Sequence, residues 1–304
     1  MPKTDCNENM IEKFINYLRY ERNRSELTVT GYERYLRDFE SYFKNRDSQL
    51  SWESVDSDII RDWMESMMDK GNTATSINRR LSALRSLYRF ALSRRLVERD
   101  PAHGITGPKK QKPLPQYVRE AEMDRLLDHT EWGEDYNNVR VRTIILMFYQ
   151  TGMRVSELIG LNDADVDFTS HQLKVTGKRD KQRIIPFGDE LEQVLKDYMK
   201  RRDELPQRQT DALFVDQKGA RVKYEQVRRE VRSSLSQVCS LKKRSPHVLR
   251  HTFATAMLNN EAGLESVKKL LGHESLSTTE IYTHTTFEQL KRAYENAHPR
   301  KTNQ

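Results

Sequence analysis

The sequence predicts a mainly α-helical protein of two domains, in which a four-helix N-terminal domain precedes an α+β domain with a small antiparallel sheet. The chain has 304 residues, which is long for one domain and sufficient for two hydrophobic cores. Apolar residues recur at every third or fourth position in the first hundred residues, as on one face of a helix. Segments of β-rich composition appear only beyond a stretch of proline, glycine and lysine that interrupts this periodicity.

Four segments of the N-terminal domain carry the helical periodicity. Their tyrosine, tryptophan and methionine side chains lie on the apolar stripes, and at this spacing such side chains fill a core far more often than a ligand site. We therefore expect four amphipathic helices within a domain of residues 1–100. The apolar stripes cover residues 11–18, 32–43, 59–68 and 77–92.

The fourth of these segments has a row of arginines outside its apolar stripe. Guanidinium groups match the geometry of phosphate oxygens, so this face is a candidate contact for the backbone of DNA. A solvated helix surface is the alternative that the sequence leaves open. The candidate DNA-binding side chains on this helix are Arg79, Arg80, Arg85 and Arg89.

Residues 101–115 are expected to form a basic linker between the domains. Prolines and glycines interrupt regular structure there, and apolar residues are scarce. Lys109, Lys110 and Lys112 would allow this connector to follow phosphates while the two domains hold a duplex from opposite sides. The second domain is then expected to cover residues 116–304.

The second domain combines helical and β-rich segments. Helices are expected at 118–127, 142–150 and 191–202, and again from Tyr224 onward, with breaks at Gly263, Gly272 and Pro299. The segments 166–168, 172–175 and 183–187 are short, β-rich and separated by turn residues. They predict the small antiparallel sheet.

Four short strings in the second domain contain the chemical groups that phosphoryl transfer on DNA requires. A phosphodiester is negatively charged and gains charge as a nucleophile attacks, so guanidinium groups aimed at its non-bridging oxygens stabilise the transition state. Each string alone is a weak indication, because single Arg, Lys or Tyr residues are usually structural. The strings are TGMRVSEL around Arg154, VTGKRDKQR around Lys178, SPHVLRHTFAT around His247 and Arg250, and LLGHESLSTTEIYTH around His273 and Tyr282.

In this order and at these distances, the strings resemble the tyrosine recombinase family, and its Xer-type and integrase-type members most closely. The resemblance spans nearly the whole chain and is most specific in the HxxRH and LGH-x8-Y strings. Met153, Arg179 and Asp180 depart from the common residues of these motifs without removing a functional group. The resemblance implies a SAM-like core-binding fold for the N-terminal domain and a catalytic role for Arg154, Lys178, His247, Arg250, His273 and Tyr282.

The resemblance implies that Tyr282 is the nucleophile. A phenol with a pKa of about 10 is ionised in only about one molecule in a thousand at pH 7, so neighbouring groups must favour the ionised tyrosine or accept its proton. His247 is expected to exchange a proton with the phenol, and Lys178 is expected to protonate the departing 5′ oxygen. The product is a 3′-phosphotyrosyl bond between enzyme and DNA.

The remaining site residues are expected to hold the phosphate. Arg154 and Arg250 stabilise the charge of the transition state, and His273 donates a hydrogen bond to a non-bridging oxygen. Glu157 follows Arg154 by one helical turn and is expected to orient this arginine from behind. An ordinary carboxylate on a helix surface is the alternative for Glu157.

The chemistry implied here needs neither a cofactor nor a metal. A phosphotyrosyl bond preserves the energy of the broken phosphodiester, so a 5′-hydroxyl group reverses the reaction without an energy source. The sequence has no GxxxxGK[ST] loop, no cluster of carboxylates of the two-metal kind and no Cys-rich motif. His247 and His251 have the helical spacing of zinc ligands but lack a third ligand of clear spacing.

The expected partner is double-stranded DNA, bound by a homotetramer or heterotetramer on two recombination sites. Chromosome-dimer resolution by a Xer-type enzyme and insertion or excision of a mobile element both fit; the compact two-domain length slightly favours the first. A type IB topoisomerase is an alternative that the N-terminal helical domain argues against, and an architectural DNA-binding protein without catalysis is another. Leu290 and Tyr294 predict a short C-terminal docking helix, which packs on its own domain or, as in related recombinases, in a neighbouring protomer.

Composition is consistent with a cytoplasmic protein that binds a polyanion. The formal net charge is +7, from 52 Lys and Arg against 45 Asp and Glu, although charge alone does not identify a partner. Cys6 and Cys239 form no framework of spacings for disulfides. No signal peptide precedes the first helix, and no apolar run is long enough to cross a membrane.

Overall fold

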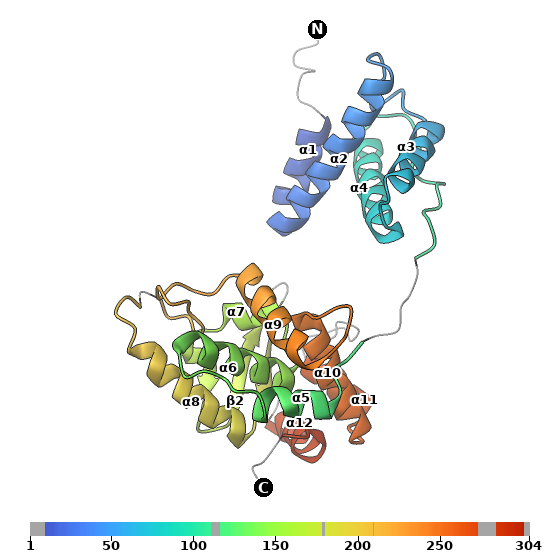
Figure 1. Cartoon of the computed structure of the whole chain (residues 1–304). Coiled ribbons are helices and arrows are strands. Elements are labelled where there is room, and N and C mark those ends of the chain that lie inside the picture. Colours follow the sequence, from blue (N-terminus) through green and yellow to red (C-terminus); the bar gives the residue numbers. More distant parts are fainter. Residues whose placement is uncertain (1–9, 111–115, 178–179, 209, 273–283, 301–304) are drawn as a thin grey trace. The chain divides into compact units, whose positions relative to one another are not determined.

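The computed structural model describes residues 10–110, 116–177, 180–208, 210–272 and 284–300, with the side chains of the last range described from Leu290 onward. The chain divides into two compact units, Met1–Pro113 and Leu114–Gln304, and the division falls inside the predicted linker. Each unit has its own hydrophobic core. Figure 1 follows the chain through both units.

The first unit is a small helical domain, as the apolar periodicity predicts. Asp56 accepts hydrogen bonds from two backbone N–H groups at the start of its third helix, and Thr73 does the same once for the fourth. The core between these helices is rich in aromatic rings, among them Phe14, Phe39 and Phe43, all fully buried. The helices are α1 (Met10–Asn16), which continues as a π-helical turn (Tyr17–Glu21), α2 (Glu26–Arg46), α3 (Ser57–Asp69) and α4 (Ala74–Ser93).

The second unit contains helices around a small sheet, and the predicted fold class is confirmed. The strands β1 (Val166–Asp167), β2 (Gln172–Thr176) and β3 (Gln182–Pro186) pair antiparallel in the order β1-β2-β3. In the register of β2 and β3, Leu173 lies opposite Ile185 and Val175 opposite Arg183. The helices are α5 (Glu120–Asp128), α6 (Tyr136–Thr151), α7 (Val155–Gly160), α8 (Asp189–Asp203), α9 (Tyr224–Val238), α10 (Pro246–Asn259), α11 (Leu264–Leu271) and α12 (His284–Ala297), with a 3-10 turn at Asp163–Asp165.

Helix α6 is the central helix of the second unit. It is buried on all sides from Thr143 to Thr151 and packs against α8, α9 and α10. Gly152 ends it with a φ of 59°, in the left-handed region that favours glycine. A Cβ atom at this position would lie 2.4 Å from Phe253 and 2.8 Å from Leu271, so no larger residue fits without a shift of the neighbouring helices.

The C-terminal helix α12 packs on its own unit, against α10, α11 and β3. Leu290 and Tyr294 are buried, and the Tyr294 hydroxyl donates to Gln150 Oε1 at 3.2 Å. His298, also buried, stacks on the Tyr294 ring with 5.1 Å between the centroids. Docking of this helix in a second protomer stays a prediction.

Among the helices of the described ranges, none combines the length and the apolar character needed to cross a lipid bilayer.

Candidate active site

Arg154 lies at the junction between α6 and α7, where local capping fixes its position. It is the N-cap residue of α7, and its backbone N–H donates to Glu157 Oε2 at 2.7 Å. Its side chain turns onto the same carboxylate, with 2.8 Å between Nη1 and Oε1. About a third of the Arg154 side chain, 35%, is exposed, so the guanidinium has protein on one side and solvent on the other.

Glu157 is a buried carboxylate shared by two arginines. Arg183 of β3 forms a bidentate pair with it, in which Nη1–Oε1 and Nη2–Oε2 are both 2.8 Å. Burial alone would raise the pKa of Glu157, but the Arg183 pair and the hydrogen bonds from Arg154 lower this pKa to about 2. Glu157 therefore stays ionised at any physiological pH.

Arg250 enters the same region from the first turns of α10, which begins at Pro246. Its side chain is almost fully buried, and Nη1 donates to the carbonyl of Gly152 at 2.7 Å. Burial, followed by the charges of Arg154 and Arg183, lowers its pKa to about 10. The three guanidiniums of Arg154, Arg183 and Arg250, which we call the arginine cluster, face one buried carboxylate, so positive charge is in excess.

The arginine cluster converges on the C-terminal end of α11. The last carbonyls of a helix have no partner within the helix and carry partial negative charge, so they attract cations. Three consecutive carbonyls there each accept a hydrogen bond from a different arginine. The pairs are Arg183 Nε to Leu270 O at 2.8 Å, Arg250 Nη2 to Leu271 O at 2.6 Å, and Arg154 Nη2 to Gly272 O at 3.1 Å.

His247 precedes Arg250 by one turn of α10 and is exposed. Partial burial of the ring, and then the charges of Arg250, His251 and Arg154, lower the pKa of His247 below its usual value. At neutral pH the imidazole is therefore mostly uncharged and able to accept a proton.

Lys178, His273 and Tyr282 lie outside the described residues. The residues beside them are described. Gly177, directly before Lys178, closes the β2–β3 turn with an N–H bond of 2.7 Å to the Lys181 carbonyl. A Cβ atom on Gly177 would lie 3.3 Å from Glu157 Oε1, so the turn begins against the shared carboxylate.

The candidate DNA-binding arginines of α4 differ in their surroundings. Arg79 and Arg89 are exposed, whereas Arg80 and Arg85 are partly buried. The guanidinium of Arg80 lies 5.1 Å from the centre of the Tyr35 ring and contacts Ser76 Oγ.

Arg85 makes contacts that tie down the chain after α4. Its Nε donates to the Ala102 carbonyl at 3.3 Å, and its Nη2 donates to the carbonyl of Ile105. Lys109 and Lys110 of the linker are exposed, and Lys112 lies outside the described residues. Arg79, Arg89 and these two lysines are thus the candidates whose charge faces solvent.

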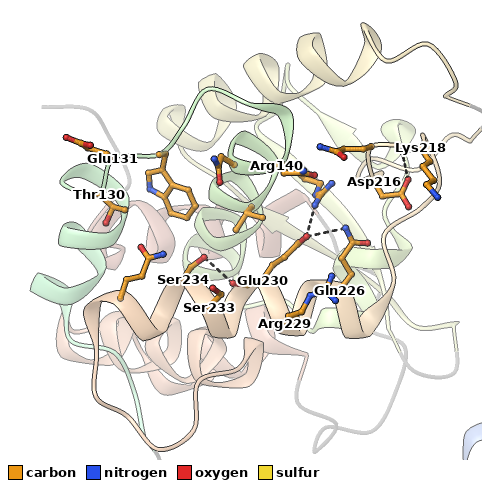
Figure 2. A pocket seen from close by; sticks show the side chains of 16 residues that line it. Thr130, Glu131, Arg140, Asp216, Lys218, Gln226, Arg229, Glu230, Ser233 and Ser234 are labelled. Carbon is orange, nitrogen blue, oxygen red and sulfur yellow. Dashed lines mark hydrogen bonds and ion pairs between the residues drawn. The ribbon is translucent and has the colours of Figure 1, made fainter.

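Two other features of the second unit hold polar groups close together. His171, Asp189 and Glu192 place ligand atoms within 4.8 Å of one another, but Lys196 also bonds to Glu192 and supplies the positive charge that a metal would bring. A hollow of about 540 Å³ lies between residues 130–132, the first turns of α6, the 216–218 turn and α9. Figure 2 shows the side chains that line it. Neither feature includes a residue of the arginine cluster.

Arg140 and Glu230 line this hollow and form an ion pair through one contact, Arg140 Nη2 to Glu230 Oε1 at 2.6 Å (Figure 2). Arg140 is 1% exposed, and its Nε and Glu230 Oε2 have no hydrogen-bond partner among the described residues.

The role of Arg183 was not predicted from the sequence. It is the last residue of the VTGKRDKQR string around Lys178, where it follows other charged residues and was given no role. The strand pattern does indicate that Arg183 points inward. Arg183 and Ile185 are two residues apart and so lie on the same face of β3, and Ile185 is fully buried. A charged residue at an inward position of a strand needs a buried counter-charge, and Glu157 is that partner.

Comparison with known proteins follows the same division of the chain. The phage integrase family matches residues 116–289, and the phage integrase N-terminal SAM-like domain matches residues 11–95. The chain belongs to the phage integrase family of tyrosine recombinases. As a tyrosine recombinase it is an enzyme that transfers DNA strands, so the predicted enzyme class is confirmed.

Relatives of this recombinase align with it from end to end. Tyrosine recombinase XerD of Oceanobacillus iheyensis is 36% identical over 299 residues, which cover 96% of this chain and 99% of the relative. Tyrosine recombinase XerC of Chlorobaculum tepidum is 35% identical over 324 residues, which cover 98% of this chain and 96% of the relative. The predicted function, site-specific DNA recombination by an enzyme of the Xer type, is confirmed at the level of the family.

Solved structures show the same fold. XerH site-specific recombinase bound to difH substrate, in a pre-cleavage complex, is 25% identical, with a TM-score of 0.68 over 93% of this chain and 83% of that chain. The Tn1549 transposon integrase in complex with transposon right end DNA is 21% identical and has a TM-score of 0.72. This match covers 95% of this chain and 98% of that chain. The second likeness supports the fold alone.

Proposed function

We propose that this recombinase cuts DNA with Tyr282 and holds the scissile phosphate with Arg154 and Arg250. One observation carries the proposal: the two arginines come from distant parts of the chain and both bond to carbonyls at the end of α11. The next residues along the chain are the segment from His273 to Tyr282. The segment that carries the proposed nucleophile therefore follows directly on Gly272, whose carbonyl accepts a hydrogen bond from Arg154.

The excess positive charge of the arginine cluster supports this assignment. Attack on a phosphodiester places further negative charge on the non-bridging oxygens, and fixed guanidiniums stabilise that charge without reorganising. The same charge favours the phenolate form of a tyrosine brought beside it. Loss of one such donor is expected to slow cleavage roughly 10²- to 10³-fold.

Proton transfer is assigned to the histidine and lysine of the site. His247 has a lowered pKa and is mostly neutral at pH 7, so it is suited to take the phenol proton as Tyr282 attacks. Lys178 then gives a proton to the 5′ oxygen as its bond to phosphorus breaks. His273 completes the contacts to the phosphate. In the reverse step a 5′-hydroxyl attacks the 3′-phosphotyrosyl bond and the same groups act in the opposite sense.

We further infer a tetramer on two duplex recombination sites, with the exposed Arg79, Arg89, Lys109 and Lys110 on DNA phosphates. The full-length similarity to XerC and XerD favours chromosome-dimer resolution over the integration of a mobile element. Such a substrate lies in the cytoplasm of a bacterium, which is where the protein would act. Neither topoisomerase activity nor a purely architectural role accounts for this similarity.

Trapping of a covalent complex tests the proposal. Nicked duplexes that carry a library of candidate sites, incubated with protein in EDTA, should give a denaturant-stable adduct with wild type and none with Tyr282→Phe. Tyr20→Phe is a matched control, because Tyr20 is an exposed tyrosine of the other unit. Sequencing of the trapped DNA identifies the site. An adduct that persists in Tyr282→Phe would place the nucleophile elsewhere.

A further inference from the structure

Arg183 is the most buried member of the arginine cluster, and its guanidinium reaches three elements at once. It belongs to β3, forms the bidentate pair with Glu157 of α7 and donates Nε to the Leu270 carbonyl of α11. Only 6% of the residue is exposed. A phosphate outside the protein therefore has little access to this side chain, in contrast to Arg154.

The contacts of Arg183 are those that only an arginine makes. Its planar fork supplies two parallel N–H groups to one carboxylate and a third N–H group in a different direction. A lysine at this position has the same charge but no fixed fork, so it cannot hold both oxygens of Glu157 and the Leu270 carbonyl together. The close packing continues at Gly272, where a Cβ atom would lie 3.2 Å from the Arg183 side chain.

Glu157 connects Arg183 to Arg154, because its carboxylate accepts hydrogen bonds from both arginines. Oε1 accepts from the Nη1 atoms of Arg154 and Arg183, and Oε2 accepts from the backbone N–H of Arg154 and Nη2 of Arg183. Because Arg183 fixes both oxygens, the carboxylate has one orientation in which to receive Arg154. The partly exposed guanidinium of Arg154 is thereby held at two of its N–H groups, by Glu157 and by the Gly272 carbonyl.

We propose that Arg183 is a positioning residue that acts on the scissile phosphate through Glu157 and Arg154. This proposal rests on the assignment of Arg154 to the phosphate. Without Arg183, Glu157 is free to turn and Arg154 follows it away from the place where charge develops. A displacement of about 1 Å is enough to cost a reaction on the order of 10²-fold, so we expect Arg183→Gln to slow cleavage by about 10- to 100-fold.

A substrate with a methylphosphonate at the scissile position provides the decisive readout. This group lacks the negative charge of a phosphodiester, so its cleavage depends much less on a guanidinium aimed at that charge. Arg154→Ala and Arg183→Gln should both be slow on the phosphodiester and should both approach the wild-type rate on the methylphosphonate. The double variant Arg154→Ala/Arg183→Gln should be no slower than Arg154→Ala, because both changes remove the same interaction.

Arg202→Gln is the matched control. Arg202 is also fully buried, pairs with Asp163 at 2.6 and 3.1 Å and donates to the Leu213 carbonyl, away from the arginine cluster. Its substitution should lower thermal stability and leave the cleavage rate of the folded protein unchanged on both substrates. Arg183→Lys, which retains the charge, provides a second variant in case Arg183→Gln does not fold, and it should show the same rate loss on the phosphodiester.

The outcomes separate the two proposals. Equal slowing of an Arg183 variant on both substrates, or wild-type cleavage by Arg183→Lys, overturns the positioning role of Arg183. Failure of Arg154→Ala to recover on the methylphosphonate instead overturns the assignment of Arg154 to the phosphate. Recovery of both single variants, with no added loss in the double variant, supports both proposals.

Discussion

Replacement of Glu157 by glutamine gives a pH-dependent change in stability whose size follows from the structure. The pKa of this carboxyl falls from 4.5 to about 2 on folding. At about 1.4 kcal/mol for each pKa unit, ionised Glu157 contributes about 3 kcal/mol to the free energy of unfolding at pH 7. A loss of this size is in the range expected when one partner of a buried ion pair is removed.

The sign of the pH dependence is fixed by the direction of the shift. A lowered pKa in the folded state means that the contribution is complete above pH 4.5 and declines as the pH falls from there toward 2. Glu157→Gln has no group to titrate at this position. The difference in stability between wild type and Glu157→Gln should therefore be about 3 kcal/mol at pH 7 and about 2 kcal/mol at pH 3.5.

Urea unfolding of the two proteins at pH 7, 5 and 3.5 measures this difference. Glu204→Gln is a matched control in the same unit, because Glu204 is an exposed carboxylate at the end of α8 and its replacement should change stability little at each pH. A difference for Glu157→Gln that does not change between pH 7 and 3.5 would refute the reasoning, since the loss would then come from packing and not from the charge pair.

Three further predictions concern DNA binding, proton transfer and the C-terminus. The double variant Arg79→Ala/Arg89→Ala should weaken DNA binding and reduce the slope of log affinity against log salt concentration by about two. A salt titration followed by fluorescence anisotropy measures this slope. An unchanged slope would mean that these side chains do not contact phosphates. Lys178→Ala should cleave DNA slowly, and a substrate with a sulfur 5′ leaving group should restore much of the rate, because a thiolate leaves without a proton. Single-turnover cleavage assays measure both rates. No recovery on the sulfur substrate would mean that another group is the general acid. Arg300→Ala should remove the ion pairs of this arginine with Asp128 and Glu190 and increase hydrogen exchange at the end of α12. Unaltered exchange there would show that the apolar contacts of the helix suffice.

The helices and the sheet were predictable because their patterns are local. The apolar spacing in 77–92 gives α4 (Ala74–Ser93) closely, and the β-rich segments around the 177–182 turn give β2 and β3. Helix α7 was harder to predict. It spans six residues, Val155–Gly160, which is too short for a periodic pattern, and it is specified by the contact of Glu157 with the Arg154 backbone.

The candidate site was predictable where a family motif marks a residue and not where only burial does. Arg154 and Arg250 occupy active-site positions of the family, whereas Arg183 is one of several charged residues in the string around Lys178 and is distinguished only by its three buried contacts. The row of arginines on α4 shows the reverse case. From sequence all of its members look equivalent, but Arg85 bonds to the Ala102 and Ile105 carbonyls, which a helical periodicity cannot reveal because these acceptors lie beyond the helix.

The position of the arginine cluster at the end of α11 has a consequence for the nucleophile. The carbonyls of Leu270, Leu271 and Gly272 accept from all three arginines, so these three side chains fix the end of this helix. The chain from His273 to Tyr282 starts at that end. On the proposal that Arg154 and Arg250 bind the phosphate, a change in either one alters both the charge available there and the last described turn before this segment, so substitutions of these two arginines should combine less than additively.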